Sequence, residues 1–123
     1  MFIKIDLNSD VPIYLQIKNE IIEGIAKGEL REGDTLPPVR RLAEELGINF
    51  HTVNKAYNLL RQEGLISLNR KKGAVIISRE KSSKDLTKLE KLLTPIVNEY
   101  YCKNFTKEDF VSVIDKIFDK IGI

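Results

Sequence analysis

The stretch LAEELGINFHTVNKAYNLL, residues 42–60, contains two short amphipathic segments on either side of a glycine. Ala43 is small enough for two helices to cross closely over it, and Gly47 tolerates the positive φ of a tight turn. Val53, six residues after Gly47, is placed to fill the crossing. These offsets match the helix-turn-helix pattern, in which the second helix enters the major groove of DNA. Ala, Gly and Val are common residues, so these offsets alone are only moderately specific for a helix-turn-helix. The flanking sequence supplies the further evidence.

The sequence before this stretch predicts a first helix over residues 12–27. Asp10 and Pro12 offer a cap and an early proline, and Gly28 stops the pattern. The turn-rich connector GELREGDTLPP, residues 28–38, follows. Isoleucines recur every four residues and form the expected buried stripe: Ile13, Ile17, Ile21 and Ile25.

The helix-turn-helix itself is expected at about residues 39–58, followed by a β-hairpin wing at about 65–78. The first of its helices spans 39–46, and the second is capped by Asn49 and continues to Gln62. LISL, residues 65–68, and AVII, residues 74–77, read as two short strands joined by the loop NRKKG. The residues expected to face inward on the second helix are Val53, Ala56, Leu59 and Leu60.

The polar segment SREKSSKD, residues 78–85, is the expected boundary between a winged helix-turn-helix domain, 1–79, and a helical tail, 80–123. Two amphipathic helices are expected in the tail, the second opening on a capping box of Thr106 and Asp109. Their apolar faces are too broad to be buried against each other alone, so we predict a symmetric dimer interface. Its expected members are Leu89, Leu93, Ile96, Tyr100, Phe110, Ile114, Ile117, Phe118 and Ile121. The alternative is a tail that folds onto its own winged-helix domain.

The composition is that of a soluble globular protein, with 42% apolar and 31% charged residues. No apolar run approaches the roughly 20 residues of a membrane span, and MFIKIDLNSD lacks the features of a signal peptide. The single cysteine, Cys102, excludes an internal disulfide and a Cys-based zinc site within one chain. We therefore expect a cytoplasmic protein with no membrane association, no cofactor and no metal site.

Positive charge is concentrated around the helix-turn-helix. Between Arg40 and Lys72 there are seven basic and three acidic residues, whereas from Glu80 onward eight lysines are balanced by eight acidic residues. An excess of basic residues in the same window as the helix-turn-helix pattern indicates an anionic partner. Two short helices followed by a basic hairpin therefore predict a protein that is mainly α with a small β-hairpin wing and that binds double-stranded DNA.

The segment LPPVRRLAEELGINFHTVNKAYNLLRQEGLISLNRKKGAVI resembles the DNA-binding domain of GntR-family bacterial transcription regulators. The similarity covers about the first 79 residues, and VRRLA, NFHTVNKAY and the short helical tail resemble the YtrA-type subfamily. The resemblance implies that Arg40, the exposed helix start at Asn49, Phe50, His51, Thr52 and Asn54, and Gly73 at the wing tip contact DNA. MocR-type regulators share these motifs, but the chain is too short for their pyridoxal-phosphate-binding domain.

Many family members carry arginine where this chain has Phe50 and Asn54, so guanine-reading contacts are not carried over to these positions. Asn54 can pair with an adenine edge and Phe50 can touch a thymine methyl group, which favours an A·T-leaning half-site. Phe50 has the alternative of folding back onto its own domain. His51 is interpreted as a groove or phosphate contact, with a bystander position on the surface as the alternative.

Further candidate DNA contacts follow from charge and position, and each has a structural alternative. Arg41 can be a solvated arginine, Lys55 can pair with Glu63 or solvent, and Tyr57 can divide its surface between the core and a phosphate. The basic loop of the wing, with Arg70, Lys71 and Lys72, can serve solubility alone, although its place beside a recognition helix favours phosphate contact.

These observations predict a dimeric repressor that reads a palindromic operator, with residues 49–62 in the major groove and 69–73 in the minor groove. One alternative is a regulator gated by a small molecule or metal at a dimer cleft of the tail, and another is a winged helix that binds protein. An enzyme is not expected, because His51 and Cys102 fall in different parts of the chain and no nucleotide-binding fingerprint is present.

Overall fold

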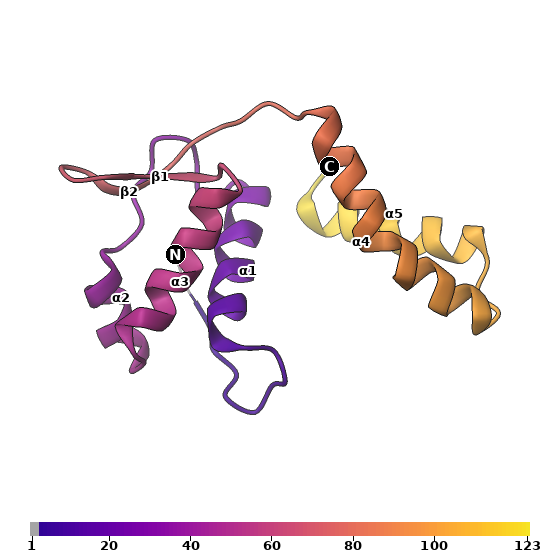
Figure 1. Ribbon diagram of the computed structural model, residues 1–123, viewed down its shortest axis with the longest axis horizontal. Helices are drawn as coiled ribbons and strands as arrows, with labels where there is room; N and C mark the ends of the chain where they lie inside the picture. Colours follow the sequence, from indigo (N-terminus) through magenta and orange to yellow (C-terminus); the bar gives the residue numbers. More distant parts are fainter. Residues whose placement is uncertain (1–2) are drawn as a thin grey trace. The chain divides into compact units, whose positions relative to one another are not determined.

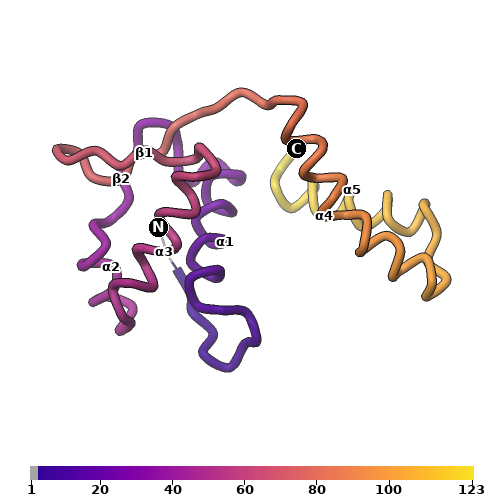
Figure 2. The backbone as a smooth tube through the Cα atoms, in the orientation of Figure 1, coloured from indigo at the N-terminus to yellow at the C-terminus, as the bar shows by residue number. Residues whose placement is uncertain are grey.

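The computed structural model describes residues 3–123, which divide after Arg79 into two compact units. Each unit is described by itself (Figures 1 and 2). The first contains α1 (Ile13–Ala26), α2 (Val39–Leu46), α3 (Phe50–Gln62), β1 (Ile66–Asn69) and β2 (Gly73–Ile76), and the second contains α4 (Ser83–Cys102) and α5 (Lys107–Ile121). The prediction of a mainly α fold with a small β-hairpin wing is confirmed.

The turn between α2 and α3 has the geometry expected from its sequence. Gly47 ends α2 with φ 66°, a left-handed conformation in which a side chain would be strained, and the Ile48 amide donates to the Ala43 carbonyl at 3.0 Å. The Asn49 carboxamide oxygen accepts from the His51 amide at 2.8 Å and caps α3. The bounds of α2, the Gly47 turn and the Asn49 cap are thereby confirmed.

The core of the first unit lies where α3 contacts both α1 and α2 (Figure 1). Ile17 and Ile21 of α1 and Val53 of α3 have no exposed surface, and Ala43 at the helix crossing is 4% exposed. Burying an aliphatic side chain of this kind stabilises a fold by about 1.5–3 kcal/mol. Three residues predicted to be buried are only half-buried: Ile13 and Ile25, near the two ends of α1, and Leu59.

The start of α1 differs from the prediction, because Asp10 does not cap the helix. Pro12 is the N-cap residue and makes no side-chain capping bond. Gln16 reaches back instead, and its amide nitrogen donates to the carbonyls of Asp6 and Val11 at 2.9 and 2.8 Å. Gln16 thus fastens the preceding segment to the helix, but no side chain within residues 3–123 accepts from the first amides of α1. The helix also ends one residue earlier than expected, with Lys27 as its C-cap.

The hairpin forms as predicted, with each strand displaced by one residue. β1 and β2 pair in antiparallel register from Ile66–Ile76 to Asn69–Gly73, so the turn is confined to residues 70–72. The Asn69 side-chain oxygen closes this turn by accepting from the amides of Lys71 and Lys72 at 2.8 and 3.3 Å. Gly73 begins the return strand with φ 76°, a conformation that glycine adopts without strain.

The connector before α2 pairs with the free edge of β2, which the sequence pattern did not predict (Figure 2). Thr35 forms an antiparallel bridge with Val75, and the Leu36 amide donates to the Ala74 carbonyl at 2.8 Å. The prolines and glycines of the connector indicate a turn, so the sequence did not predict that it pairs with a strand. The bridge ties the wing to the segment that leads into α2.

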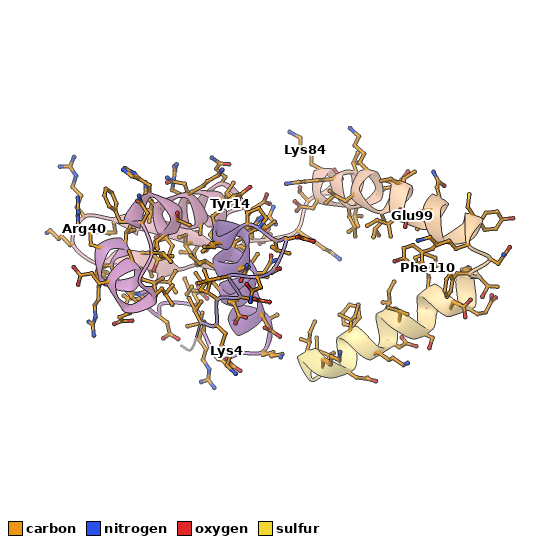
Figure 3. All side chains as sticks on the ribbon, turned by 90° about the horizontal axis from the view of Figure 1, so that it is seen from below. Lys4, Tyr14, Arg40, Lys84, Glu99 and Phe110 are labelled. Carbon is orange, nitrogen blue, oxygen red and sulfur yellow. The ribbon has the colours of Figure 1, made fainter. Side chains whose placement is uncertain are left out.

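In the second unit, α4 and α5 diverge from a short turn (Figure 3). The Asp109 amide donates to the Thr106 hydroxyl at 3.2 Å while Asp109 accepts from the Thr106 amide at 2.8 Å, which confirms the predicted capping box. Near the turn, the Tyr100 ring lies 5.6 Å from the Phe105 ring and 6.1 Å from the Phe110 ring, measured between centroids. No residue of either helix is buried.

Between residues 3 and 123, no helix combines the length and the apolar character that a bilayer crossing requires.

Candidate nucleic-acid interface

The start of α3 presents polar side chains to solvent, while its opposite face belongs to the core. Asn49, His51 and Asn54 are exposed and Thr52 is half-buried, whereas Val53 between them has no exposed surface. Helical periodicity causes this separation, because residues three and four apart share a face. The structure therefore places the four polar candidates on an exposed helical surface of a size that a major groove accommodates.

Arg40 and Phe50, which come from different helices, meet at the edge of this surface. The guanidinium carbon of Arg40 in α2 lies over the Phe50 ring, 4.3 Å from its centroid. The His51 ring lies beside the same phenyl ring, with centroids 4.1 Å apart and planes tilted by 33°. Phe50 is half-buried and packs against the hydrophobic core, in line with the alternative that it folds back onto its own domain.

Arg41 and Lys55 each have a partner within the first unit. The Arg41 guanidinium binds the Glu45 carboxylate one turn later in α2, with a nitrogen–oxygen distance of 3.2 Å. Arg41 also lines a polar hollow of about 660 Å³ that it shares with Glu29, Asp34 and Glu45. The Lys55 ammonium lies 3.9 Å from the centroid of the Tyr14 ring in α1.

The environments of these two residues therefore differ from that of Arg40. The three carboxylates of the hollow beside Arg41 repel phosphate, and Lys55 already gains a favourable contact with an aromatic face. Sequence spacing gave no sign of Tyr14 as a partner, because it lies 41 positions before Lys55.

The wing carries three exposed basic side chains at its tip, Arg70, Lys71 and Lys72. The Asn69 bonds to the backbone of the turn and the positive φ of Gly73 hold these residues on a defined loop. Asn69 was not among the predicted site residues, although asparagine followed by basic residues and a glycine is a recognisable turn signal.

Tyr57 corrects one expectation about the site. The residue was expected to divide its surface between the core and a phosphate, but only 1% of it is exposed. Its hydroxyl donates to the Pro37 carbonyl at 2.6 Å, and burial, followed by the nearby Glu45 carboxylate, raises the pKa of the phenol. Tyr57 therefore fastens α3 to the connector and has no surface to offer to DNA.

Replacing Tyr57 with Phe is expected to lower the free energy of unfolding by about 1–3 kcal/mol, because the Pro37 carbonyl is left without its donor in a partly buried position. Urea denaturation followed by circular dichroism measures the change. Tyr101→Phe removes a hydroxyl from a residue that is 75% exposed and should change stability by less than about 0.5 kcal/mol. Equal stability of the two variants would contradict a structural role for the Tyr57 hydroxyl.

Within the part of the chain that the structure describes, no three His, Cys, Asp or Glu side chains are grouped as metal ligands. The surface is formed by the exposed start of α3, the Arg40 side chain stacked on Phe50, and the basic turn of the wing. Together these features define a winged helix-turn-helix DNA-binding protein. The sequence profile of the bacterial regulatory proteins of the gntR family matches residues 13–76, and the chain belongs to this family.

Three known proteins illustrate the relationship. The chain is 42% identical over 81 residues to the HTH-type transcriptional repressor YtrA of Bacillus subtilis, an alignment that covers 66% of this chain and 62% of that protein. It is 31% identical to a transcriptional antiterminator from Listeria monocytogenes, whose crystal structure superposes with a TM-score of 0.88 over 100% of this chain and 94% of that one.

The third is the DNA-binding domain of AraR, whose crystal structure contains its operator ORX1. It is 27% identical to this chain and superposes with a TM-score of 0.53 over 59% of this chain and 90% of that domain. The resemblance to GntR-family regulators of the YtrA type is thereby confirmed. The chain spans less than two thirds of the length of the Bacillus repressor.

Proposed function

We propose that this protein is a transcriptional repressor that binds a palindromic DNA operator as a homodimer. The start of α3 lies in the major groove and the tip of the wing, residues 69–73, lies in the minor groove. The carrying observation is that the same unit exposes both the polar surface of α3 and the basic turn of the wing. The operator complex of the AraR domain supports the same use of this fold.

Each part of the surface has a chemistry that suits its proposed position. Asn54 presents a carboxamide, which can both donate to and accept from an adenine edge. His51 and Thr52 offer donors to bases or phosphates beside it. Positive charge for the DNA backbone comes from Arg40, Arg70, Lys71 and Lys72. Asn49 caps the start of α3, and Gly73 ends the turn of the wing.

Arg41 and Lys55 fit this scheme less well than the sequence suggests. Arg41 is paired with Glu45 at the acidic hollow, and Lys55 is engaged with Tyr14. A phosphate contact by either residue requires its present partner to be given up, which offsets part of the gain. We therefore assign the electrostatic contribution mainly to Arg40 and the wing.

Dimerisation is proposed because one such domain reads only about half a turn of DNA, too little to specify an operator. Leu89, Leu93, Ile96 and Tyr100 of α4 follow a four-three-four spacing, and Phe110, Ile114, Ile117 and Ile121 of α5 repeat it. This spacing gives each helix one apolar stripe of the kind that packs against a partner helix. Ile96, Ile114, Ile117 and Phe118 remain between 44% and 51% exposed in a single copy.

A second copy covers both stripes without a new sequence element, because two-fold symmetry makes each surface available to its counterpart. The proposal places the protein in the cytoplasm and requires neither a cofactor nor catalysis. A small-molecule effector at a dimer cleft of the tail is not part of the proposal.

Selection of duplexes from a randomised DNA pool by the full chain tests the function. Enrichment of a palindromic sequence is expected, and enrichment of no sequence would contradict operator binding. Asn54→Ala should weaken binding to the selected duplex by about 1–3 kcal/mol while sparing a scrambled duplex, because only a base-specific interaction is removed. Asn98→Ala, an exposed amide on α4, is the matched control. Equal losses on both duplexes would exclude base reading by Asn54.

A further inference from the structure

Phe50 occupies the first position of α3, where its side chain stands between the core and the proposed DNA-binding surface. It is half-buried and packs against the hydrophobic core, so its ring is held in place from below. The Arg40 guanidinium lies over this ring at 4.3 Å, and the His51 ring lies beside it at 4.1 Å. Two neighbouring side chains, both exposed to solvent, thus contact the ring.

We propose that Phe50 is a positioning residue, whose ring holds the Arg40 guanidinium in place for DNA while Phe50 itself makes no base contact. This inference rests on the proposed function and changes the role of one member of the surface. It makes Arg40 and Phe50 a cross-helix pair that acts as one unit, with Arg40 as the group that touches DNA.

The chemistry of the guanidinium explains how such a pair works. Arginine presents its N–H donors at the edge of a planar group, so a guanidinium that lies over a ring keeps those donors available for a phosphate or a guanine edge. An arginine on a helix surface otherwise samples many rotamers, and ordering it on binding reduces affinity. A ring already fixed by the core reduces that ordering cost before DNA arrives.

The alternative is that Phe50 touches a thymine methyl group, as its residue type first suggested. The two roles predict different couplings. If Phe50 acts through Arg40, its replacement has no effect once Arg40 is absent. If Phe50 touches thymine, its replacement weakens binding with or without Arg40, and removing the thymine methyl groups weakens wild-type binding as well.

The experiment measures binding of the full chain to the duplex selected by the wild type. Phe50→Leu should lower affinity about two- to five-fold for each half-site, the range expected when one exposed cation–π interaction is removed. Phe50→Tyr should stay within about two-fold, because it keeps the ring. In the Arg40→Ala background, Phe50→Leu should cause no further loss.

Three results would overturn the proposal. They are unchanged affinity of Phe50→Leu, the same loss in the presence and absence of Arg40, and a loss that disappears when deoxyuridine replaces thymidine. Melting temperatures of all variants are compared, because Phe50 also packs against the core. If Phe50→Leu lowers the melting temperature, Phe50→Met, which has an unbranched side chain, takes its place in the comparison with and without Arg40. Failure of the wild type to select any duplex would count against the proposed function instead.

Discussion

Ile117→Glu is expected to convert the proposed dimer to a monomer and to lower its affinity for a palindromic duplex by about 10²–10⁴-fold. Ile117 is 51% exposed in one copy and lies within the apolar stripe of α5. Burial of a carboxylate in a symmetric interface places two like charges close together without a partner, which is strongly unfavourable. Once the copies separate, each half-site must be bound independently. Light scattering and titration of the duplex measure the two effects.

A suitable control places the same charge on the opposite face of α5. Ser112 is exposed and lies about half a turn of the helix away from the stripe, so Ser112→Glu should leave both the mass and the affinity unchanged. Binding to a duplex with a single half-site should be equal for Ile117→Glu and wild type, since the DNA-binding unit is not altered. A monomeric wild type at micromolar concentration, or a dimeric Ile117→Glu variant, would refute the proposed interface.

The helix-turn-helix could be predicted from sequence because local chemistry determines it. Gly47 permits the left-handed turn and Asn49 supplies the cap, so α2 and the start of α3 are specified by neighbouring residues. The pairing of the connector was harder to predict from the sequence, because its bridge joins Thr35 and Val75, which lie 40 positions apart. The N-cap of α1 was also misjudged: Pro12 and not Asp10 occupies this position, and Gln16 binds the carbonyls of the preceding segment.

The site shows the same division between local and distant determinants. Exposure of His51 and Asn54 follows from helical periodicity, which the sequence displays directly. The stack of Arg40 on Phe50, the Lys55–Tyr14 contact and the burial of Tyr57 depend on how three helices pack. Residue spacing within one helix does not predict contacts between helices. The residues expected on one surface are therefore divided among exposed positions, the core and contacts within the unit.

Raising the salt concentration from about 50 to 200 mM is expected to weaken operator binding by about 10³–10⁵-fold. Arg40, Arg70, Lys71 and Lys72 are exposed on each copy, so a dimer can neutralise about eight phosphates and release their condensed counterions. A flat response to salt would contradict phosphate contact altogether. The wing can then be tested directly, because three of the four side chains belong to one turn.

The triple replacement of Arg70, Lys71 and Lys72 with alanine should reduce the slope of log affinity against log salt by about 0.9 for each phosphate that is no longer neutralised. It should weaken selected and scrambled duplexes alike, because phosphate contacts carry no sequence information. Replacing Lys84, Lys91 and Lys116 with alanine removes the same charge from exposed positions of the tail, away from its apolar stripes, and should leave the slope unchanged. An unaltered affinity in the wing variant would instead favour a winged helix that binds protein, since such a surface needs no basic turn.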